Sequence, residues 1–184
     1  MTNALSKIAS ALLAVLLLYL FPAVQTAQRE ADIRYMSAYH ALTEFADAVR
    51  TKGYISPVMY EQFTRSLEAK GNLYDIELEH RHKKYHPEYG DPADPDTFQD
   101  RFSVVYDAYY TEDILGVLFS ENRAAAGEEQ VKYTLQAGDF FSVTVKARSR
   151  SPYDVLSEFL YGTGTAAGYK DVLSYGGMVL NEDY

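Results

Sequence analysis

The stretch KIASALLAVLLLYLFPAVQTAQRE, residues 7–30, decides the fold, because no charged residue lies between Lys7 and Arg29. Residues 8–28 would form a helix of about 31 Å at ~1.5 Å rise per residue, which matches the ~30 Å hydrocarbon core of a bilayer. Ten of these residues are Leu, Ile, Val or Phe, and together they favour insertion by roughly 3 to 6 kcal/mol. Pro22 removes one backbone donor and is expected to kink the helix without ending it. The segment is predicted to span a membrane.

Three interpretations of this segment are open: a retained anchor, a cleaved signal peptide and a buried helix of a soluble protein. Signal peptides carry small residues at positions −3 and −1 of the cleavage site. Cleavage after Ala27 would leave Gln25 at −3, and cleavage after Ala23 would leave Phe21 there. Both sites are poor, so residues 1–28 are interpreted as an N-terminal tail and a retained transmembrane anchor.

Charge and cysteine content indicate the class of partner and the location. The chain has a formal net charge of −9 and a pI near 4.9, which argues against nucleic acid as a partner. It has no cysteine that would require a reducing compartment. Counting Lys and Arg on each side of the span does not favour an internal N-terminus, but a long domain translocates largely regardless of charge. We expect a single-pass protein of the cell membrane whose C-terminal domain lies outside the cytoplasm.

The helix is predicted to continue beyond the span as an amphipathic arm over residues 29–53. No Gly or Pro occurs in residues 23–52, and Gly53 is a plausible C-terminal cap. Apolar residues recur at the helical period and are expected to pack on the following domain or on other helices of an assembly. They are Tyr35, Ala38, Tyr39, Leu42, Phe45, Ala46 and Val49.

Residues 54–184 are predicted to form an extracytoplasmic α+β domain, in which short helices accompany an antiparallel sheet. Ser56 and Pro57 are typical of a helix start, and alternating polar and apolar residues from residue 73 onward indicate a strand with one solvated face. Helices are expected at 56–71, 111–119 and 151–162. Strands are expected at 73–85 and 101–110, as a hairpin over 131–147 turning at Ala137, Gly138 and Asp139, and at 172–180 with an interruption at Gly176 and Gly177. Linkers are expected at 86–97, 121–130 and 161–168.

Three histidines suggest a metal site. His80 and His82 share one face of the predicted strand, about 7 Å apart, with His86 and the acidic residues Asp75 and Glu79 nearby. The same run, EHRHKKYH, also contains Arg81, Lys83 and Lys84, which would repel a cation. A solvated strand end is the favoured interpretation.

Two loops resemble ligand-binding loops only partly. The loop GDPADPD and its neighbourhood contain Asp91, Asp94, Asp96 and Asp100, but the spacing lacks the central Gly and the closing Glu of an EF-hand, so a structural turn is favoured over a calcium site. The loop YGTGTAAGY contains Gly162, Gly164 and Gly168, but it follows a helix, and its third Gly is one position late for a dinucleotide-binding loop.

The rest of the chain contains no local catalytic motif. It has no nucleophile elbow, phosphate-binding loop or zinc-protease helix, and without cysteine it cannot be a thiol enzyme. We therefore expect a protein that is not an enzyme, with no catalytic, cofactor-binding or metal-binding residues and no cofactor.

A span that contains a proline and continues into an amphipathic helix followed by an antiparallel sheet resembles the pilins and pseudopilins. The segments AVRTKGYISPVMYEQFTRSLEAKGNLYDIELEH (48–80) and SYGGMVLNEDY (174–184) also resemble small membrane-anchored proteins of Gram-positive tight-adherence (Tad/Flp) pilus or secretion systems. The resemblance implies a pilin-like layout and other pilus or secretion proteins as partners through the N-terminal helix. In contrast to pilins of that class, no Gly precedes the span and no acidic residue lies within it.

Two functions follow from these observations. The first is a non-enzymatic, membrane-anchored component of a pilus-like or secretion assembly, and the long helix favours it. The second is a membrane-tethered binding module, in which a tyrosine-rich sheet captures a protein or small ligand.

Overall fold

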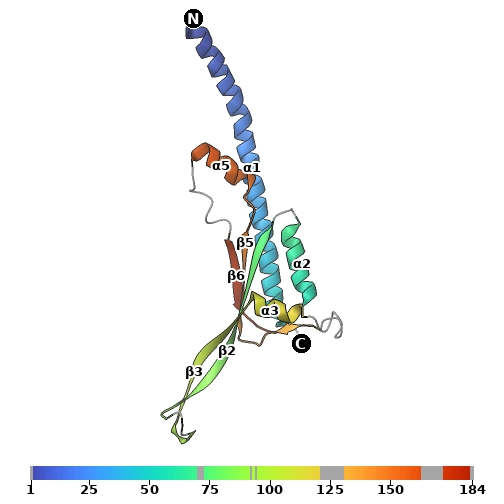
Figure 1. Cartoon of the computed structure of the whole chain (residues 1–184), viewed down its shortest axis with the longest axis vertical. Helices are drawn as coiled ribbons and strands as arrows, with labels where there is room; N and C mark the ends of the chain where they lie inside the picture. The colour runs from blue at the N-terminus through green and yellow to red at the C-terminus, as the bar shows by residue number, and fades with distance from the viewer. Residues whose placement is uncertain are drawn as a thin grey trace.

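A single helix, α1, runs from Thr2 to Lys52 and contains both the predicted span and the predicted arm (Figure 1). The computed structural model describes residues 2–69, 73–91, 93, 95–120, 131–162 and 172–182. Helix α1 passes through Pro22 and through the predicted anchor boundary at residue 28 without a break. It ends at Gly53, which has a φ of 69° and donates its N–H to the Val49 carbonyl at 2.8 Å. A left-handed residue at this position closes the last helical turn, as Gly commonly does.

The elements after α1 confirm the predicted α+β layout. Strand β1 (Tyr54–Ile55) leads into α2 (Pro57–Glu68), where Ser56 Oγ accepts the N–H of Met59 at 3.2 Å as the predicted N-cap. The remaining elements are β2 (Tyr74–Tyr89), a 3-10 turn (Pro95–Thr97), β3 (Phe98–Tyr110), α3 (Thr111–Leu118), β4 (Tyr133–Thr134), β5 (Phe140–Ala147), α5 (Pro152–Tyr161) and β6 (Val172–Met178).

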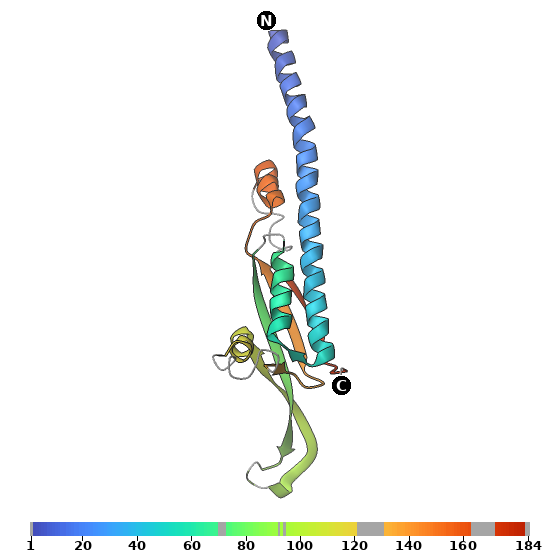
Figure 2. The same ribbon diagram turned by 90° about the vertical axis from the view of Figure 1, so that its right-hand side faces the viewer.

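The main sheet is antiparallel, with the strand order β3-β2-β5-β6. Leu78 of β2 lies opposite Val143 of β5, and His80 lies opposite Phe141, so these four residues face the core. The C-terminal half of α1 packs on β5 and β6, and α2 packs beside α1 (Figure 2). The other face carries ion pairs such as Glu77 with Lys146, which confirms the predicted solvated face.

The core is formed by the second half of α1 together with the inner face of the sheet. The apolar stripe on α1 is confirmed from Ala38 onward, but Tyr35 and Tyr39 are 41% and 44% exposed and lie in a stacked pair with each other. The stripe is also wider than predicted, because Ala41 is buried. The buried apolar residues of α1 are Ala38, Ala41, Leu42, Phe45, Ala46 and Val49, and they pack with Leu78, Ile114, Leu118, Phe141, Val143 and Val145.

A long hairpin projects from this sheet. Strand β5 pairs with β2 up to Arg81, whereas β2 continues to Tyr89 with β3 as its only partner among the described strands. Figures 1 and 2 show these two strands extending past the rest of the sheet, at the end of the molecule opposite the N-terminus. We call this projection, residues 82–89 with 98–107, the β2–β3 arm. The predicted linker at 86–97 is thus wrong in its first part, because residues 86–89 are strand.

Two strand predictions are also wrong. Strand β4 pairs with β1 instead of forming a hairpin with β5, although the chain does turn at Ala137–Asp139. Strand β6 is continuous through Gly176. A Cβ at Gly176 would lie 2.4 Å from the Phe141 carbonyl oxygen, so this glycine permits close approach of β5 and does not interrupt the strand.

Candidate functional site

The strongest cluster of chemically active side chains lies where the β2–β3 arm leaves the sheet. His80 and His82 share one face of β2, as predicted, with ring centroids 6.2 Å apart. His80 is only 4% exposed, and its side chain points into the domain. The predicted solvated strand end is therefore wrong, because β2 continues past these residues and the core covers His80.

Asp139 lies opposite His82, at the position that would extend the ladder between β5 and β2 by one pair. Its side chain is 2% exposed. The Asp139 carboxylate binds the β2 backbone at the point where the next residue pair of the β2–β5 ladder would lie. The Oδ1 atom accepts the Lys83 N–H at 3.1 Å, and the Oδ2 atom accepts the Gln136 N–H at 2.8 Å. The carboxylate thus ends the β2–β5 pairing and holds the preceding turn.

The two histidines complete the hydrogen bonding of this carboxylate. His80 Nε2 lies 2.8 Å from Asp139 Oδ2, and His82 Nδ1 lies 2.9 Å from Asp139 Oδ1. An ionised carboxylate only accepts hydrogen bonds, so both of these ring nitrogens carry a proton. In neutral His80, Nδ1 then accepts the hydroxyl proton of Tyr133, with the two atoms 2.7 Å apart. Each carboxylate oxygen has one backbone donor and one imidazole donor.

This environment changes the acidity of the groups it contains. Burial alone raises the pKa of Asp139, but the hydrogen bonds from the Gln136 N–H, His80, the Lys83 N–H and His82 together hold this pKa below its ordinary value. Burial raises the pKa of Tyr133 to about 12, and the negative charge of Asp139 contributes to the rise. Asp139 is therefore a buried carboxylate that stays ionised, and Tyr133 stays protonated.

The sequence suggested five residues for a metal site, and only His80 and His82 of these lie in this cluster. Asp75 pairs with Arg148 at 3.5 Å, and Glu79 pairs with Arg81 at 2.8 Å on the opposite, solvated face. His86 is exposed farther along the arm. The sequence analysis missed Asp139 and Tyr133, because they lie more than 50 residues from His80 and reach it only through strand pairing.

The other candidate loops do not form a comparable cluster within the described chain. Asp91 is exposed and its Oδ1 accepts the Ala93 N–H at 3.0 Å, which is a turn contact. Asp96 lies in the 3-10 turn, and Asp100 follows on β3 with a φ of 54°. Asp94 lies outside the described residues. Gly162 caps α5, whereas Gly164 and Gly168 lie outside the described residues.

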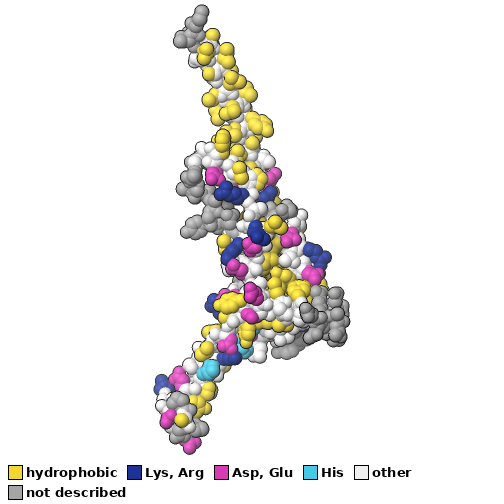
Figure 3. Space-filling view, viewed as in Figure 1, with side chains coloured by type: hydrophobic (Ala, Val, Ile, Leu, Met, Phe, Trp, Pro, Cys, Tyr) yellow, Lys and Arg dark blue, Asp and Glu magenta, His cyan; other side chains and the backbone are white. Residues whose placement is uncertain are grey.

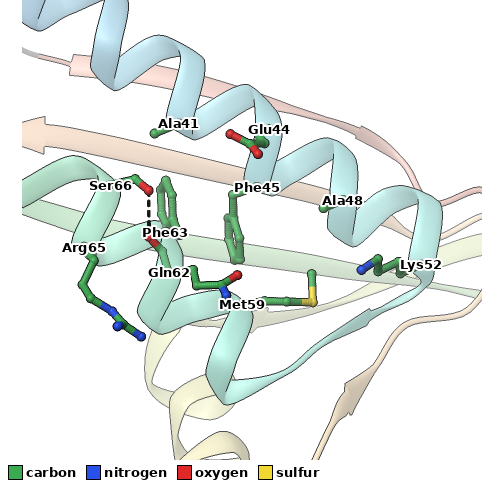
Figure 4. A pocket seen from close by; sticks show the side chains of 10 residues that line it. All are labelled: Ala41, Glu44, Phe45, Ala48, Lys52, Met59, Gln62, Phe63, Arg65 and Ser66. Atoms are coloured by element: carbon green, nitrogen blue, oxygen red, sulfur yellow. Dashed lines mark hydrogen bonds between the residues drawn. The ribbon is translucent and has the colours of Figure 1, made fainter. Parts of the chain in front are cut away.

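A groove of about 540 Å³ separates α1 from α2 (Figure 4). Its floor is the stacked pair of Phe45 and Phe63, with ring centroids 4.4 Å apart. Glu44, Lys52 and Arg65 are among the residues that line it. This is a packing seam between two helices with a charged rim, and it brings no catalytic pair together among the residues that line it.

Exposed apolar side chains gather on the N-terminal half of α1 and on the β2–β3 arm. Figure 3 shows those of α1, whereas charged side chains gather on the middle of the molecule. The helix from Ala4 to Lys52 includes an 18-residue window with a mean hydropathy of 2.1, no part of which is buried, so this helix could cross a membrane by its length and composition. The second surface is the β2–β3 arm, where Tyr85, Phe102 and Tyr106 are each more than half exposed.

Comparison with known proteins adds no assignment to these features. No protein-family model matches the chain, and neither a curated protein nor a solved structure matches it.

Proposed function

We propose that this protein is a non-enzymatic, membrane-anchored component of a pilus-like or secretion assembly, with its C-terminal domain outside the cytoplasm. The observation that carries the proposal is the contrast between the two halves of α1. One unbroken helix exposes its apolar residues in its first half and supplies the core of a folded domain with its second half.

The first half of α1 requires an apolar environment. Large exposed apolar surfaces on folded proteins mark contacts with membranes or with other proteins. Every leucine from Leu12 to Leu18 is more than half exposed, so the domain itself does not cover this surface. A bilayer provides such an environment along a helix of this length.

The helix also continues out of the predicted span without a flexible connection. Boundaries between independent domains typically fall in flexible linkers rich in Pro, Gly or polar residues, but α1 continues as helix to Lys52 and enters the core. Beyond the span, Ile33 is 54% exposed and Met36 is 68% exposed, one turn apart on α1. An apolar helical surface in this position suits packing against a neighbouring helix in an assembly.

Helix α5 supports the same arrangement. It lies beside α1 and contacts it (Figures 1 and 2). On α1 itself, one stripe of half-buried residues comprises Leu20, Ala23, Val24, Ala27, Ala31 and Arg34. Val155 and Phe159 of this helix are exposed. Exposed apolar side chains on a helix beside α1 suit contact with the boundary between headgroups and acyl chains.

The alternative function, a membrane-tethered binding module, rests on the β2–β3 arm. Its exposed Tyr85, Phe102 and Tyr106 could contact a protein partner, and aromatic residues are enriched in such contacts. In this case the span is needed only for location, and the domain would bind its partner without α1 in a membrane.

The absence of cysteine from the chain allows a direct test with single-cysteine variants in the native host. Met36→Cys places a thiol on the exposed side of α1, and Val58→Cys places a matched exposed thiol on α2. The assembly hypothesis expects crosslinks from Met36→Cys to a second membrane protein or a second copy, with few or none from Val58→Cys. Labelling of Val58→Cys in intact cells by a membrane-impermeant thiol reagent reports whether the domain is outside.

The outcomes distinguish the two functions. If Met36→Cys forms no crosslink although Val58→Cys is labelled in intact cells, the assembly hypothesis is contradicted. If a chain lacking residues 1–28 still captures its partner, the tethered binding module is favoured. If Val58→Cys is labelled only after the cells are lysed, the proposed orientation is wrong.

A further inference from the structure

The cluster formed by His80, His82 and Asp139 has the donor set of a transition-metal site. One potential ligand atom from each residue lies within 4.8 Å of those from the other two. Two imidazoles and one carboxylate are the ligands that Zn²⁺ takes in sites with three protein ligands and one open position. Ca²⁺ and Mg²⁺ prefer oxygen ligands, so the two imidazoles argue against them.

The three ligand groups are near one another but would have to adjust around a tetrahedral ion. With metal–ligand distances of about 2.0–2.2 Å, neighbouring ligand atoms lie about 3.3 to 3.5 Å apart. His80 Nε2 lies 2.8 Å from Oδ2 of Asp139, whereas His82 Nδ1 lies 2.9 Å from the other oxygen, Oδ1. Across the three residues the ligand atoms lie within 4.8 Å of one another. Binding of an ion would therefore move each imidazole about half an ångström from the oxygen that it now contacts and draw the more widely separated ligand atoms together. His82 has room to do so, because its side chain is 22% exposed.

The surrounding hydrogen bonds already orient the three ligands. Metal-binding histidines usually bond through their other ring nitrogen to an oxygen atom, which fixes the tautomer. Tyr133 occupies this position at His80 Nδ1. The Gln136 N–H uses one lone pair of Asp139 Oδ2, and the Lys83 N–H uses one lone pair of Oδ1. Each oxygen therefore keeps a second lone pair that could bind the ion.

Proton positions can adjust without loss of a proton from the cluster. In the hydrogen-bonded form, His80 carries its proton on Nε2 and accepts from Tyr133. With an ion on Nε2, neutral His80 carries its proton on Nδ1 and donates it to the Tyr133 oxygen. Neutral His82 likewise carries its proton on Nε2, so that its Nδ1 can bind the ion. The ion replaces two hydrogen bonds with coordinate bonds, and the Asp139 carboxylate stays ionised throughout.

The cationic neighbours do not oppose the ion in the way that the sequence suggests. Side chains alternate along a strand, so Arg81 and Lys83 project from the face opposite His80 and His82. Arg81 pairs with Glu79 there, and Lys83 lies over the Tyr85 ring at 4.9 Å from its centroid. Lys84 shares the face of the histidines but pairs with Asp107, which lies opposite His82 on β3.

We propose that His80, His82 and Asp139 bind one divalent transition-metal ion of the zinc class, with water in the remaining position. His80 and His82 lie on β2 at the base of the arm, and Asp139 immediately precedes β5. The ion would link β2, at the base of the arm, to the start of β5, where the pairing between these two strands ends. Its role is to fix the base of the arm.

The test uses the full-length protein in detergent after removal of metals with EDTA. Calorimetric titration with ZnCl₂ should give one ion per chain for the wild type and for His86→Ala, the matched control on the same strand. His82→Ala should weaken binding at least a hundredfold. Tyr133→Phe should weaken it about 10- to 100-fold through loss of the outer hydrogen bond. Zinc should raise the melting temperature of the wild type and of His86→Ala but not that of His82→Ala.

Two further measurements keep the test independent of folding defects. If His82→Ala is not folded by circular dichroism, His82→Gln replaces it, because Gln keeps a polar side chain of similar reach. Co²⁺ bound to the wild type should show the intense visible absorption of a tetrahedral site, and His82→Gln should lack it. The proposal is overturned if the wild type binds no zinc saturably, or if the His82 variants bind it with unchanged stoichiometry and affinity.

Discussion

Replacing Leu42 with alanine should unfold the domain at a lower temperature without affecting its membrane anchor. Leu42 is 0% exposed and lies in the stripe of α1 that contacts the sheet. Truncation of a buried leucine to alanine costs about 2 to 5 kcal/mol, because it removes apolar contacts and leaves a cavity. For a domain of this size the melting temperature should fall by about 4 to 20 °C.

The same substitution at Leu13 provides the matched control. Leu13 lies on the same helix but is 61% exposed, so it makes little contact with the domain. Leu13→Ala should leave the unfolding temperature of the domain unchanged. It should reduce the free energy of membrane insertion by only a few tenths of a kcal/mol.

The assay is thermal unfolding of the full-length protein in detergent, followed by near-ultraviolet circular dichroism of the tyrosines, which reports tertiary packing of the domain. Membrane fractionation of both variants from cells reports the anchor. Equal shifts in melting temperature for Leu42→Ala and Leu13→Ala would contradict the division of α1 into an exposed half and a core half. A shift below about 2 °C for Leu42→Ala would show that this stripe is not the core.

Three further predictions test other parts of the fold. Gly176→Ala should destabilise the domain by about 1 to 3 kcal/mol in urea titration, because the new Cβ would lie 2.4 Å from the β5 backbone. As a control, Gly116→Ala in α3 should stabilise the domain by about 0.5 to 1 kcal/mol, because its Cβ would meet nothing within 4 Å. Equal effects of the two substitutions would contradict the close approach of β5 and β6. Burial raises the pKa of Tyr60 above 10.0 in the folded state, so this tyrosine loses its proton at lower pH in the unfolded state. The free energy of unfolding of the wild type should therefore fall, relative to that of Tyr60→Phe, as the pH rises above about 10. Parallel profiles of unfolding free energy against pH for the two proteins would contradict this. A polarity-sensitive fluorophore on Phe159→Cys should shift to the blue in liposomes, whereas one on Val58→Cys should not; equal spectra would place α5 away from the interface.

The sequence predicted those elements whose signals are local. The helical period from Ala38 to Val49, the cap at Ser56 and the left-handed Gly53 each depend on neighbours within a few residues, and each prediction is confirmed. The alternation along β2 was recognised in the same way. Signals of this kind survive folding because they are set by the backbone of one element.

Features that depend on strand partners could not be predicted. The turn before Asp139 was recognised, but the preceding residues pair with β1, where the Leu135 N–H donates to the Gly53 carbonyl at 2.8 Å. The strand was predicted to end at residue 85, before a linker at 86–97, yet it continues through Pro87 to Tyr89. Among the described strands, β2 pairs beyond Arg81 with β3 alone, and a Pro, which lacks an N–H, is tolerated at such an edge. Asp139 was missed as a partner of His80 and His82 for the same reason, since only the β2–β5 register places it opposite His82.

The length of the β2–β3 arm sets the distance at which this protein could act if α1 is embedded as proposed. From residue 29 to Lys52 the helix rises about 36 Å. Residues 82–89 extend over about 26 Å in the arm, which runs obliquely away from the N-terminus (Figure 1). The end of the arm would therefore stand up to about 60 Å from the lipid surface. A partner in the bilayer would be out of reach of this end, and a partner held at that height would be within it.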